Sequence, residues 1–457
     1  MSRIPSLLFV LVLPVAIGGS VLAADLILPA AERSGLGLTL YQGDIALVRD
    51  RRPASLERGG NSLSLDGVSR AIRPGSAMLQ GSGVTITERG TDSRPLSAER
   101  LLAANLGRQV TLYWPGEPAT RGRVLSVEGM PLFEVDGKVM AGTPDRIVYD
   151  GLPPGLTPRP SFHARLNAES GGPHELDLTY LTGGLGWSAD ATGELDGDRM
   201  SLTVWANLGN SSGADFPDAT LRLVAGTFNQ AGDFGPRLMA GPARAATEPL
   251  REIAGPYHVY TIAEPITLKD GENRQIPLLA STQVKVHRQL VLEPLPPASL
   301  QSRTPEPRRQ HPMLVVDFTN TAKNGLGKPL PAATIRITER GPGGEIMLLG
   351  EDRLEALPEG AEARLTLGEA FDVTATRVQT DFQKIAADVS ESAWEVRLSN
   401  GGDRAAVVTV REAFHSDWLV IDENAPHVKD SAGSTHWTVT APPKGQALLR
   451  YRVRVKG

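Results

Sequence analysis

Apolar and polar residues alternate along most of the chain, and this pattern predicts β-strands. Residues 37–56 form two alternating runs around a turn at 42–44, and 161–228 contains five longer runs of the same kind. Successive side chains of a strand point to opposite faces of a sheet, so alternation is typical of sheets that bury one face. We therefore expect an all-β fold made of several β-sandwich and small-barrel modules with one short helix.

The one segment with convincing helical spacing covers residues 97–106. Ser97 stands where an N-cap residue belongs, and Gly107 ends the segment. Five short runs follow between 108 and 151, separated by turns that contain glycine. Five strands in so short a stretch are typical of a small closed barrel, although they could also join a larger sheet.

Breaks in the pattern divide the chain into modules. A stretch rich in glycine, alanine and proline at 230–255 predicts a long loop. Residues 293–312 hold six prolines in twenty positions, which is typical of a linker. We expect an N-terminal β module at 24–96, a short helix plus small β-barrel at 97–160, a β-sandwich core at 161–309 and a C-terminal β-sandwich at 310–457.

A strand–turn–strand unit recurs weakly along the second half of the chain. Each copy has a strand, an asparagine, a turn and then a returning strand; the asparagines are Asn207, Asn320 and Asn400. An asparagine side chain bonds to its own backbone and tolerates the left-handed conformation. We therefore expect these three residues to be structural turn residues, with Asn207 at the end of its strand.

The first 23 residues have the pattern of a secretory signal peptide. Arg3 supplies the positive start, an apolar core follows, and Val21 and Ala23 flank a small-residue cleavage site. The alternative, an uncleaved anchor, is disfavoured because the apolar run is shorter than the roughly 20 residues that span a bilayer. We expect export, with the protein in the periplasm or outside the cell.

Composition narrows the class of protein further. The chain has 48 glycines and 35 prolines, about 18% of its length, where average usage is about 12% and disordered chains exceed about 25%. It has no cysteine, which excludes disulfides, thiolate metal sites, cysteine nucleophiles and a lipid-anchored cysteine after the signal. The net charge of -5 comes from interspersed charges, so no nucleic-acid partner is expected.

Ser211 lies in a G-x-S-x-G pattern at 209–213, which marks the nucleophile elbow of serine hydrolases. Such an elbow needs a strand before the serine and a helix after it. Here the following segment contains Pro217 and then alternates as a strand. We expect Ser211 to be an exposed turn residue, and we expect no catalytic residue and no enzymatic activity.

The other residues that could carry chemistry are scattered. The eight histidines show no paired metal-ligand spacing, and the oxygen-rich segment 422–430 lacks the alternation of a calcium loop. We therefore expect no metal and no cofactor. Among the six tryptophans, Trp114 and Trp418 are the best candidates for exposure, and an exposed ring could stack on a ligand such as a sugar.

Several longer segments resemble a known family. They include "LDLTYLTGGLGWSAD" at 176–190, "WANLGNSSGADFPDATLRLVAG" at 205–226 and "FTNTAKNGLGKPLPAATIRI" at 318–337. Together with further matches at 38–52 and 350–373, they resemble a secreted bacterial family that carries a domain of unknown function and is related to mucoidy inhibitor A-like proteins. The resemblance implies a β-rich protein of the bacterial envelope, connected with exopolysaccharide or surface properties, and it implies no catalytic residues.

These observations favour an exported structural or interaction protein of the bacterial envelope, whose partner is an unknown envelope protein or polysaccharide. Three alternatives stay open. The protein could bind a glycan or exopolysaccharide, it could be a serine hydrolase acting through Ser211, or it could be an adhesin or coat-like assembly that pairs through exposed edge strands.

Overall fold

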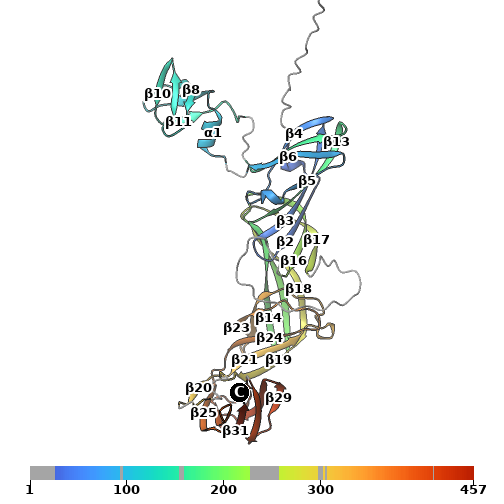
Figure 1. Cartoon of the computed structure of the whole chain (residues 1–457), viewed down its shortest axis with the longest axis vertical. Coiled ribbons are helices and arrows are strands. Elements are labelled where there is room, and N and C mark those ends of the chain that lie inside the picture. Colours follow the sequence, from blue (N-terminus) through green and yellow to red (C-terminus); the bar gives the residue numbers. More distant parts are fainter. Residues whose placement is uncertain are drawn as a thin grey trace, which may run out of the picture. The chain divides into compact units, whose positions relative to one another are not determined.

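The computed structural model describes residues 26–92, 96–153, 159–226, 257–296, 302–303, 306–414 and 416–456 (Figure 1). It divides into two compact units. The first comprises Met1–Gly37, Leu47–Thr182 and Ser212–Ala219, and the second comprises Leu38–Ala46, Gly183–Ser211 and Thr220–Gly457.

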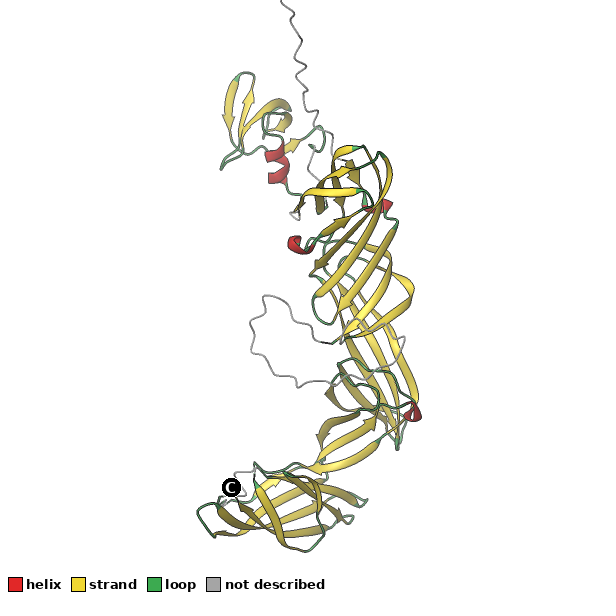
Figure 2. Ribbon diagram, turned by 45° about the vertical axis from the view of Figure 1, so that its right-hand side comes forward, coloured by secondary structure: helices red, strands yellow, loops and turns green. Residues whose placement is uncertain are grey.

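The fold class is all-β, as the alternation predicted. The structure is 65% strand and 4% helix, and the described residues contain a single α-helix, α1 (Ala98–Ala104), beside short 3-10 turns (Figure 2). Within the described ranges, no helix has both the length and the apolar character needed to cross a membrane.

The first unit begins with a four-stranded sheet in which segments far apart in sequence pair. Its order is β1-β4-β12-β6, with β1 at Leu26–Leu28, β4 at Gly59–Asp66, β12 at Ser161–Ala168 and β6 at Val84–Asp92. Strand β1 runs parallel to β4, and β12 runs antiparallel to both β4 and β6. Strand β12, which we expected in a separate sandwich at 161–309, thus shares a sheet with the segment 24–96.

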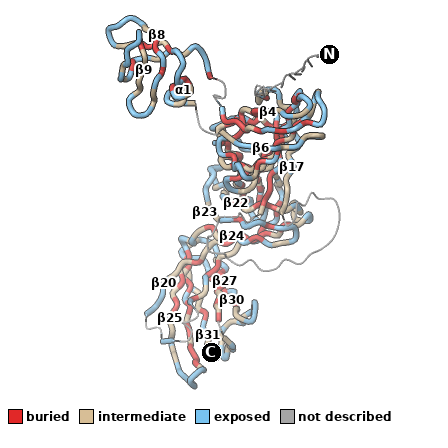
Figure 3. Tube along the Cα trace, turned by 45° about the horizontal axis from the view of Figure 1, so that its top comes forward, coloured by how far each residue is buried: buried red, intermediate tan, exposed pale blue. Residues whose placement is uncertain are grey.

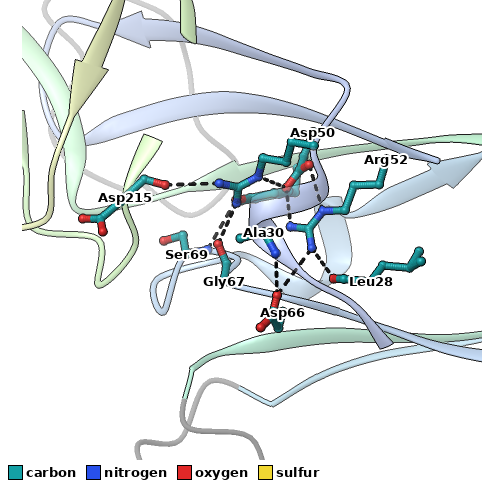
Figure 4. A network of polar contacts seen from close by, with 10 residues as sticks. Leu28, Ala30, Asp50, Arg52, Asp66, Gly67, Ser69 and Asp215 are labelled. Carbon is teal, nitrogen blue, oxygen red and sulfur yellow. Dashed lines mark hydrogen bonds and ion pairs between the residues drawn. The ribbon is translucent and has the colours of Figure 1, made fainter. Parts of the chain in front are cut away.

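A buried network of charged side chains holds β1 in place in the first unit (Figure 4). The Asp50 carboxylate accepts hydrogen bonds from Arg52 at 2.7 and 3.1 Å and from Arg33 Nε at 3.0 Å. Arg52 also donates to the Leu28 carbonyl oxygen at 2.5 Å. Because Arg52 and Asp50 have no exposed side-chain surface, their charges need these partners, and each guanidinium nitrogen of Arg52 has one.

A small module of the first unit contains α1 and the five short strands that follow it. The strands form one sheet in the order β10-β9-β8-β7-β11, with bounds Lys138–Ala141, Leu132–Val135, Thr120–Ser126, Gln109–Tyr113 and Arg146–Val148. The N-cap prediction is confirmed, because the Ser97 hydroxyl accepts a hydrogen bond from the Arg100 backbone N–H. Leu102 of α1 packs on Phe133 and its neighbours in the core of this module.

The expectation of a small closed barrel at 97–160 is wrong. Among the described residues, β10 and β11 are the two ends of the sheet and do not pair with each other. The strands do not join a larger sheet either. One face of this open sheet is covered by α1, so the sheet buries a core without closing.

Another sheet of the chain has six strands. Its order is β17-β16-β2-β3-β13-β5, with bounds His258–Leu268, Phe216–Ala225, Gly35–Tyr41, Ile45–Leu56, Gly172–Thr182 and Met78–Gln80. Strands β2 and β3 are the two alternating runs predicted at 37–56.

The second unit contains a five-stranded sheet that joins the middle of the chain to its last third. Its order is β18-β15-β14-β22-β23, with bounds Asn273–Lys285, Arg199–Asn210, Leu185–Asp196, Ala333–Arg340 and Ile346–Leu354. Strand β14 runs parallel to β22, with Ala189 opposite Ala333. The expected boundary at 309–310 therefore falls between segments that share this sheet.

The C-terminal sandwich consists of two sheets of the second unit. One has the order β24-β21-β19-β27-β30-β29, with bounds Glu362–Glu369, Met313–Thr319, His287–Leu292, Ala406–Ala413, Ser434–Ala441 and Val428–Ser431. The other has the order β20-β25-β26-β31-β28, with bounds Arg308–Gln310, Val373–Lys384, Val389–Asn400, Gln446–Lys456 and Asp417–Glu423.

One core fills the space between these two sheets. It contains Trp394 and Tyr451 from one sheet and Val410 and Trp437 from the other. In Figure 3 the buried segments follow the strands, whereas turns and edge strands are mostly exposed. We refer to these two sheets and their core as the C-terminal sandwich.

Three expectations concern residues that are wholly or partly outside the described ranges. The signal peptide at 1–23 and the long loop at 230–255 lie outside them. Of the expected linker at 293–312, the structure describes 293–296, 302–303 and 306–312, and the last of these contains strand β20, which pairs with β25.

Candidate functional site

Ser211 lies in a turn between two strands. Strand β15 ends at Asn210 and β16 begins at Phe216, so a strand follows where an elbow needs a helix. The Ser211 hydroxyl donates to the Gly184 carbonyl oxygen at 3.3 Å, and among the described residues no histidine or carboxylate bonds to it. Gly213 has φ +80, a left-handed conformation that favours glycine, whereas Gly209 lies in extended β15.

Asn207 does not end its strand, contrary to our expectation. Strand β15 continues through it to Asn210. The Asn207 side chain points along the sheet surface, where it donates to Asp190 Oδ2 at 2.6 Å and accepts from Gln275 Nε2 at 2.7 Å. The residue that ends the strand is Asn210, three positions later, so the sequence repeat was aligned three residues out of register at this copy.

Asn210, Asn320 and Asn400 share one arrangement at the end of a strand. In each, the side-chain amide donates to a carbonyl oxygen in a second connection between strands. The backbone N–H of the same asparagine donates to the carbonyl oxygen four residues later in that connection. The amide acceptors are Leu268, Leu357 and Ala441, and the backbone acceptors are Glu272, Ala361 and Gly445. In all three copies, the asparagine therefore joins the end of its strand to a second turn through the same two kinds of hydrogen bond.

The two tryptophans proposed for ligand stacking both pack within the chain. Trp114 is half-buried and lies edge-on to Phe133, with 6.3 Å between ring centroids. Trp418 is also half-buried; it stacks on Phe414 at 4.6 Å, and its indole N–H donates to the Ala432 carbonyl oxygen. The Lys429 ammonium lies 5.0 Å from the Trp418 ring centroid. Both residues keep part of their surface exposed, so stacking of a sugar on either ring stays a prediction.

A groove on the outer face of the β24–β29 sheet of the C-terminal sandwich brings cationic, hydroxyl and amide side chains together and is a candidate binding site. Val408 and Val410 of β27 point into the core, so Thr409 and Arg411 point to the opposite face. There the side chains line a groove of about 410 Å³. We call it the sheet groove; its lining residues are His287, Arg288, Gln289, Arg364, Val407, Thr409, Arg411, Asp430, His436 and Thr438.

Most charges in the sheet groove have a partner. Arg364 lies 3.7 Å from Asp317, and His436 Nδ1 lies 2.7 Å from Asp430 Oδ1. Arg411 differs. Among the described residues, no carboxylate lies within ion-pairing distance of its guanidinium and no hydrogen bond involves its side chain. The groove therefore offers one uncompensated cation, half-exposed, on a sheet face.

Neutral polar groups surround this cation. Thr409 and Thr438 are opposite each other on β27 and β30, and Arg411 is opposite His436 in the same register. The Thr409 hydroxyl donates to Gln289 Oε1 at 3.3 Å, and Gln289 Nε2 donates to Asp317. Hydroxyl and amide groups in such an array can donate to and accept from a polyhydroxylated ligand.

A second buried ion pair lies directly beneath the sheet groove. Arg377 of β25 and Glu412 of β27 approach to 3.4 Å with no exposed side-chain surface, and Tyr451 donates to Glu412 at 2.8 Å. Burial raises the pKa of Glu412 above its ordinary range, with Arg377 opposing the shift. Arg377 also donates to the Arg411 carbonyl oxygen. The backbone that carries the groove cation is thus held from inside the sandwich.

The sheet groove was not predicted from the sequence. Arg411 and His436 were visible only as polar residues alternating with valine and tryptophan in predicted strands. Their meeting depends on β27 pairing with β30 and β19, which sequence spacing does not reveal. The described residues contain no group of three metal-ligating side chains.

Comparison with known proteins adds no assignment. No model of a known protein family matches the chain, and no curated protein matches it either.

Proposed function

We propose that this chain is an exported protein of the bacterial envelope that acts by binding a glycan in the sheet groove, without catalysing a reaction. The observation that carries the proposal is the groove itself, where an unpaired Arg411 lies among hydroxyl and amide side chains on an open sheet face. The resemblance to a secreted family and the signal-like pattern at 1–23 support the location.

The open form of the sheet groove favours an extended ligand. Neighbouring strands of a sheet lie about 4.8 Å apart, so the four strands from β19 to β29 present about 15 Å of polar surface. A chain of sugar rings could lie across these strands, and its hydroxyl groups would meet Thr409 and Thr438.

Filling the groove tests this proposal. In Thr438→Trp a bulky ring replaces an exposed groove residue, and Thr380→Trp makes the same change at an exposed position of β25, in the other sheet of the sandwich. We expect the purified protein to bind polysaccharide extracted from the envelope of the bacterium that encodes it. Thr438→Trp should abolish this binding and Thr380→Trp should keep it. Equal binding by both variants would place the function elsewhere.

Export is tested separately by mass spectrometry of the protein recovered from cells. Cleavage after Ala23 should give a mature chain that begins at Ala24. A chain that begins at Met1 and stays in the cytoplasm would contradict the location.

Catalysis through Ser211 is tested with a fluorophosphonate probe, which labels activated serines. We expect no labelling, because the Ser211 hydroxyl bonds to a backbone carbonyl oxygen. Labelling that disappears in Ser211→Ala would revive the hydrolase.

A second candidate function is assembly with another protein through β23. This strand is an edge of its sheet, and Ile346, Met347 and Leu348 are three consecutive exposed apolar residues on it. Such an edge can accept a strand from a partner. Leu348→Lys should abolish cross-linking of the protein to its envelope partner and leave glycan binding unchanged.

A further inference from the structure

We infer that the ligand of the sheet groove is an acidic sugar chain and that its carboxylate binds Arg411. This inference rests on the proposed function and names the class of glycan. It follows from the distribution of charge in the groove, from the support of Arg411 and from the neutral groups around it.

The distribution of charge singles out Arg411. Arg364 has Asp317 and Glu293 as partners, and Arg288 bonds to Glu339. These arginines are neutralised within the chain, so an incoming anion would have to displace a carboxylate. Arg411 has no such partner among the described residues, so an anion can bind it without that cost.

Hydrogen bonds to the backbone at Arg411 limit the movement of this part of the site. The Arg411 carbonyl oxygen accepts a hydrogen bond from Arg377, and the next residue, Glu412, forms the buried pair with that same arginine. The strand is also paired on both sides, to β19 and to β30. A guanidinium on a fixed backbone presents its planar donor fork to a carboxylate with less loss of entropy.

The neutral neighbours favour a sugar carboxylate over a small free anion. Thr409 and Thr438 are next to Arg411 and His436 along the same two strands, at a spacing that hydroxyl groups of one ring and its neighbour can reach. Val407 is 52% exposed at the end of the row and offers an apolar surface to a ring face. A small anion would leave these groups unused.

The test compares one trisaccharide in two chemical forms. Trigalacturonic acid carries a carboxylate on each ring, and its methyl ester has the same sugars without the charge. We expect the acid to bind the purified full chain about tenfold or more tightly than the ester by calorimetry at about 0.15 M salt, since a hydrogen bond to a charged group is worth about 1.5–3 kcal/mol.

The variants assign the effect to Arg411. Arg411→Gln should weaken binding of the acid about tenfold and leave the ester unchanged. Arg397→Gln makes the same change in charge on β26, in the other sheet of the sandwich, and should leave both ligands unchanged.

Each contrary outcome is distinguishable. Equal binding of acid and ester, unaffected by Arg411→Gln, would overturn the acidic ligand while glycan binding stands. Equal weakening by Arg397→Gln and Arg411→Gln, or equally tight and Arg411-dependent binding of a sulfated neutral trisaccharide, would reduce the site to general attraction of anions and overturn the inference. Failure to bind either trisaccharide or the envelope polysaccharide would remove the proposed function and this inference together.

Discussion

Each unit of this protein buries an ion pair completely, but the two pairs are satisfied to very different degrees. In the first unit, Asp50 is shared by Arg52 and Arg33, and the remaining donors of Arg52 and Arg33 reach backbone carbonyl oxygens. In the C-terminal sandwich, Arg377 Nε and Nη1 and Glu412 Oε2 are buried without any hydrogen bond among the described residues.

The difference bears on how much a buried ion pair contributes to the stability of the fold. A buried pair recovers its desolvation cost only when the surrounding hydrogen bonds are complete. We therefore interpret the Asp50 network as a net support of the first unit, because it also fixes the Leu28 carbonyl of β1. The Arg377–Glu412 pair lacks that completeness, so we expect it to contribute little to the stability of the sandwich.

Breaking the complete network should have the largest effect. Asp50→Ala leaves Arg33 without its carboxylate and Arg52 with only Asp66, 3.7 Å away, and we expect a loss of about 3–5 kcal/mol in the stability of the first unit. Hydrogen exchange of peptides from β1, β3 and β4 measures it. The control Asp177→Ala removes the partner of Arg49, which is 61% exposed, and should cost at most about 1 kcal/mol. Equal losses would show that burial of the pair is irrelevant.

Replacing the incompletely hydrogen-bonded cluster of Arg377, Glu412 and Tyr451 by apolar residues should not lower the stability of the sandwich. The triple variant Arg377→Met, Glu412→Leu, Tyr451→Phe removes every unpaired polar atom of the cluster together with its partners. We expect the sandwich to be unchanged or stabilised by about 1–4 kcal/mol, measured by denaturant unfolding.

The corresponding change in the first unit should destabilise it. Asp50→Leu with Arg52→Met deprives Arg33 and the Leu28 carbonyl of their partners. A stabilised first unit would contradict the distinction between the two networks.

Asn400 is a fully hydrogen-bonded side chain in the same sandwich. It tests whether the loss of stability depends on complete hydrogen bonding or on the part of the molecule in which the residue lies. The Asn400 amide nitrogen lies within hydrogen-bonding distance of three carbonyl oxygens, and its Oδ1 accepts from the Gly402 N–H. Asn400→Ala should cost about 1–3 kcal/mol of sandwich stability by leaving those groups unpaired. Asn207→Ala, on a sheet surface, should cost about 1 kcal/mol or less. A smaller effect at Asn400 than at Asn207 would refute this reading.

The pH dependence of Glu412 should give the smallest effect, and its sign is fixed. Burial raises the pKa of Glu412 in the folded state above that in the unfolded chain, so its protonated form favours folding. That contribution is complete below the unfolded pKa of about 4.3 and is lost as the pH rises through the folded pKa. Relative to Glu412→Gln, the wild-type sandwich should therefore lose stability as the pH rises above about 4.3, in denaturant titrations at a series of pH values. A relative gain in stability with rising pH would mean that the attraction of Arg377 outweighs burial in setting the pKa of Glu412.

Local sequence was enough for the features that depend on local contacts. The helix at 98–104 and its Ser97 cap follow from residues within one turn, and the alternating runs identify most strands. The turn at Ser211 followed in the same way, because Pro217 and the alternation after it exclude a helix start.

Contacts between distant segments were not accessible to that reasoning. Nothing in residues 161–168 indicates that β12 pairs with β4 rather than with the strands that follow it. The repeat around Asn207 was misaligned because two asparagines lie three residues apart, and only the strand end distinguishes Asn210. The groove around Arg411 needs three strands that are far apart in sequence, so no spacing pattern could have found it.

The parallel pairing of β14 with β22 also has a consequence for the order in which the molecule can form. Ribosomes supply the chain from its N-terminus, and Ala189 is made long before its register partner Ala333. At about 5–20 residues per second, β14 waits about 7 to 30 s with one edge open. During that interval a nascent chain is exposed to strand exchange with its neighbours, so an assisting factor that covers open edges would act on this edge of β14 until β22 is made.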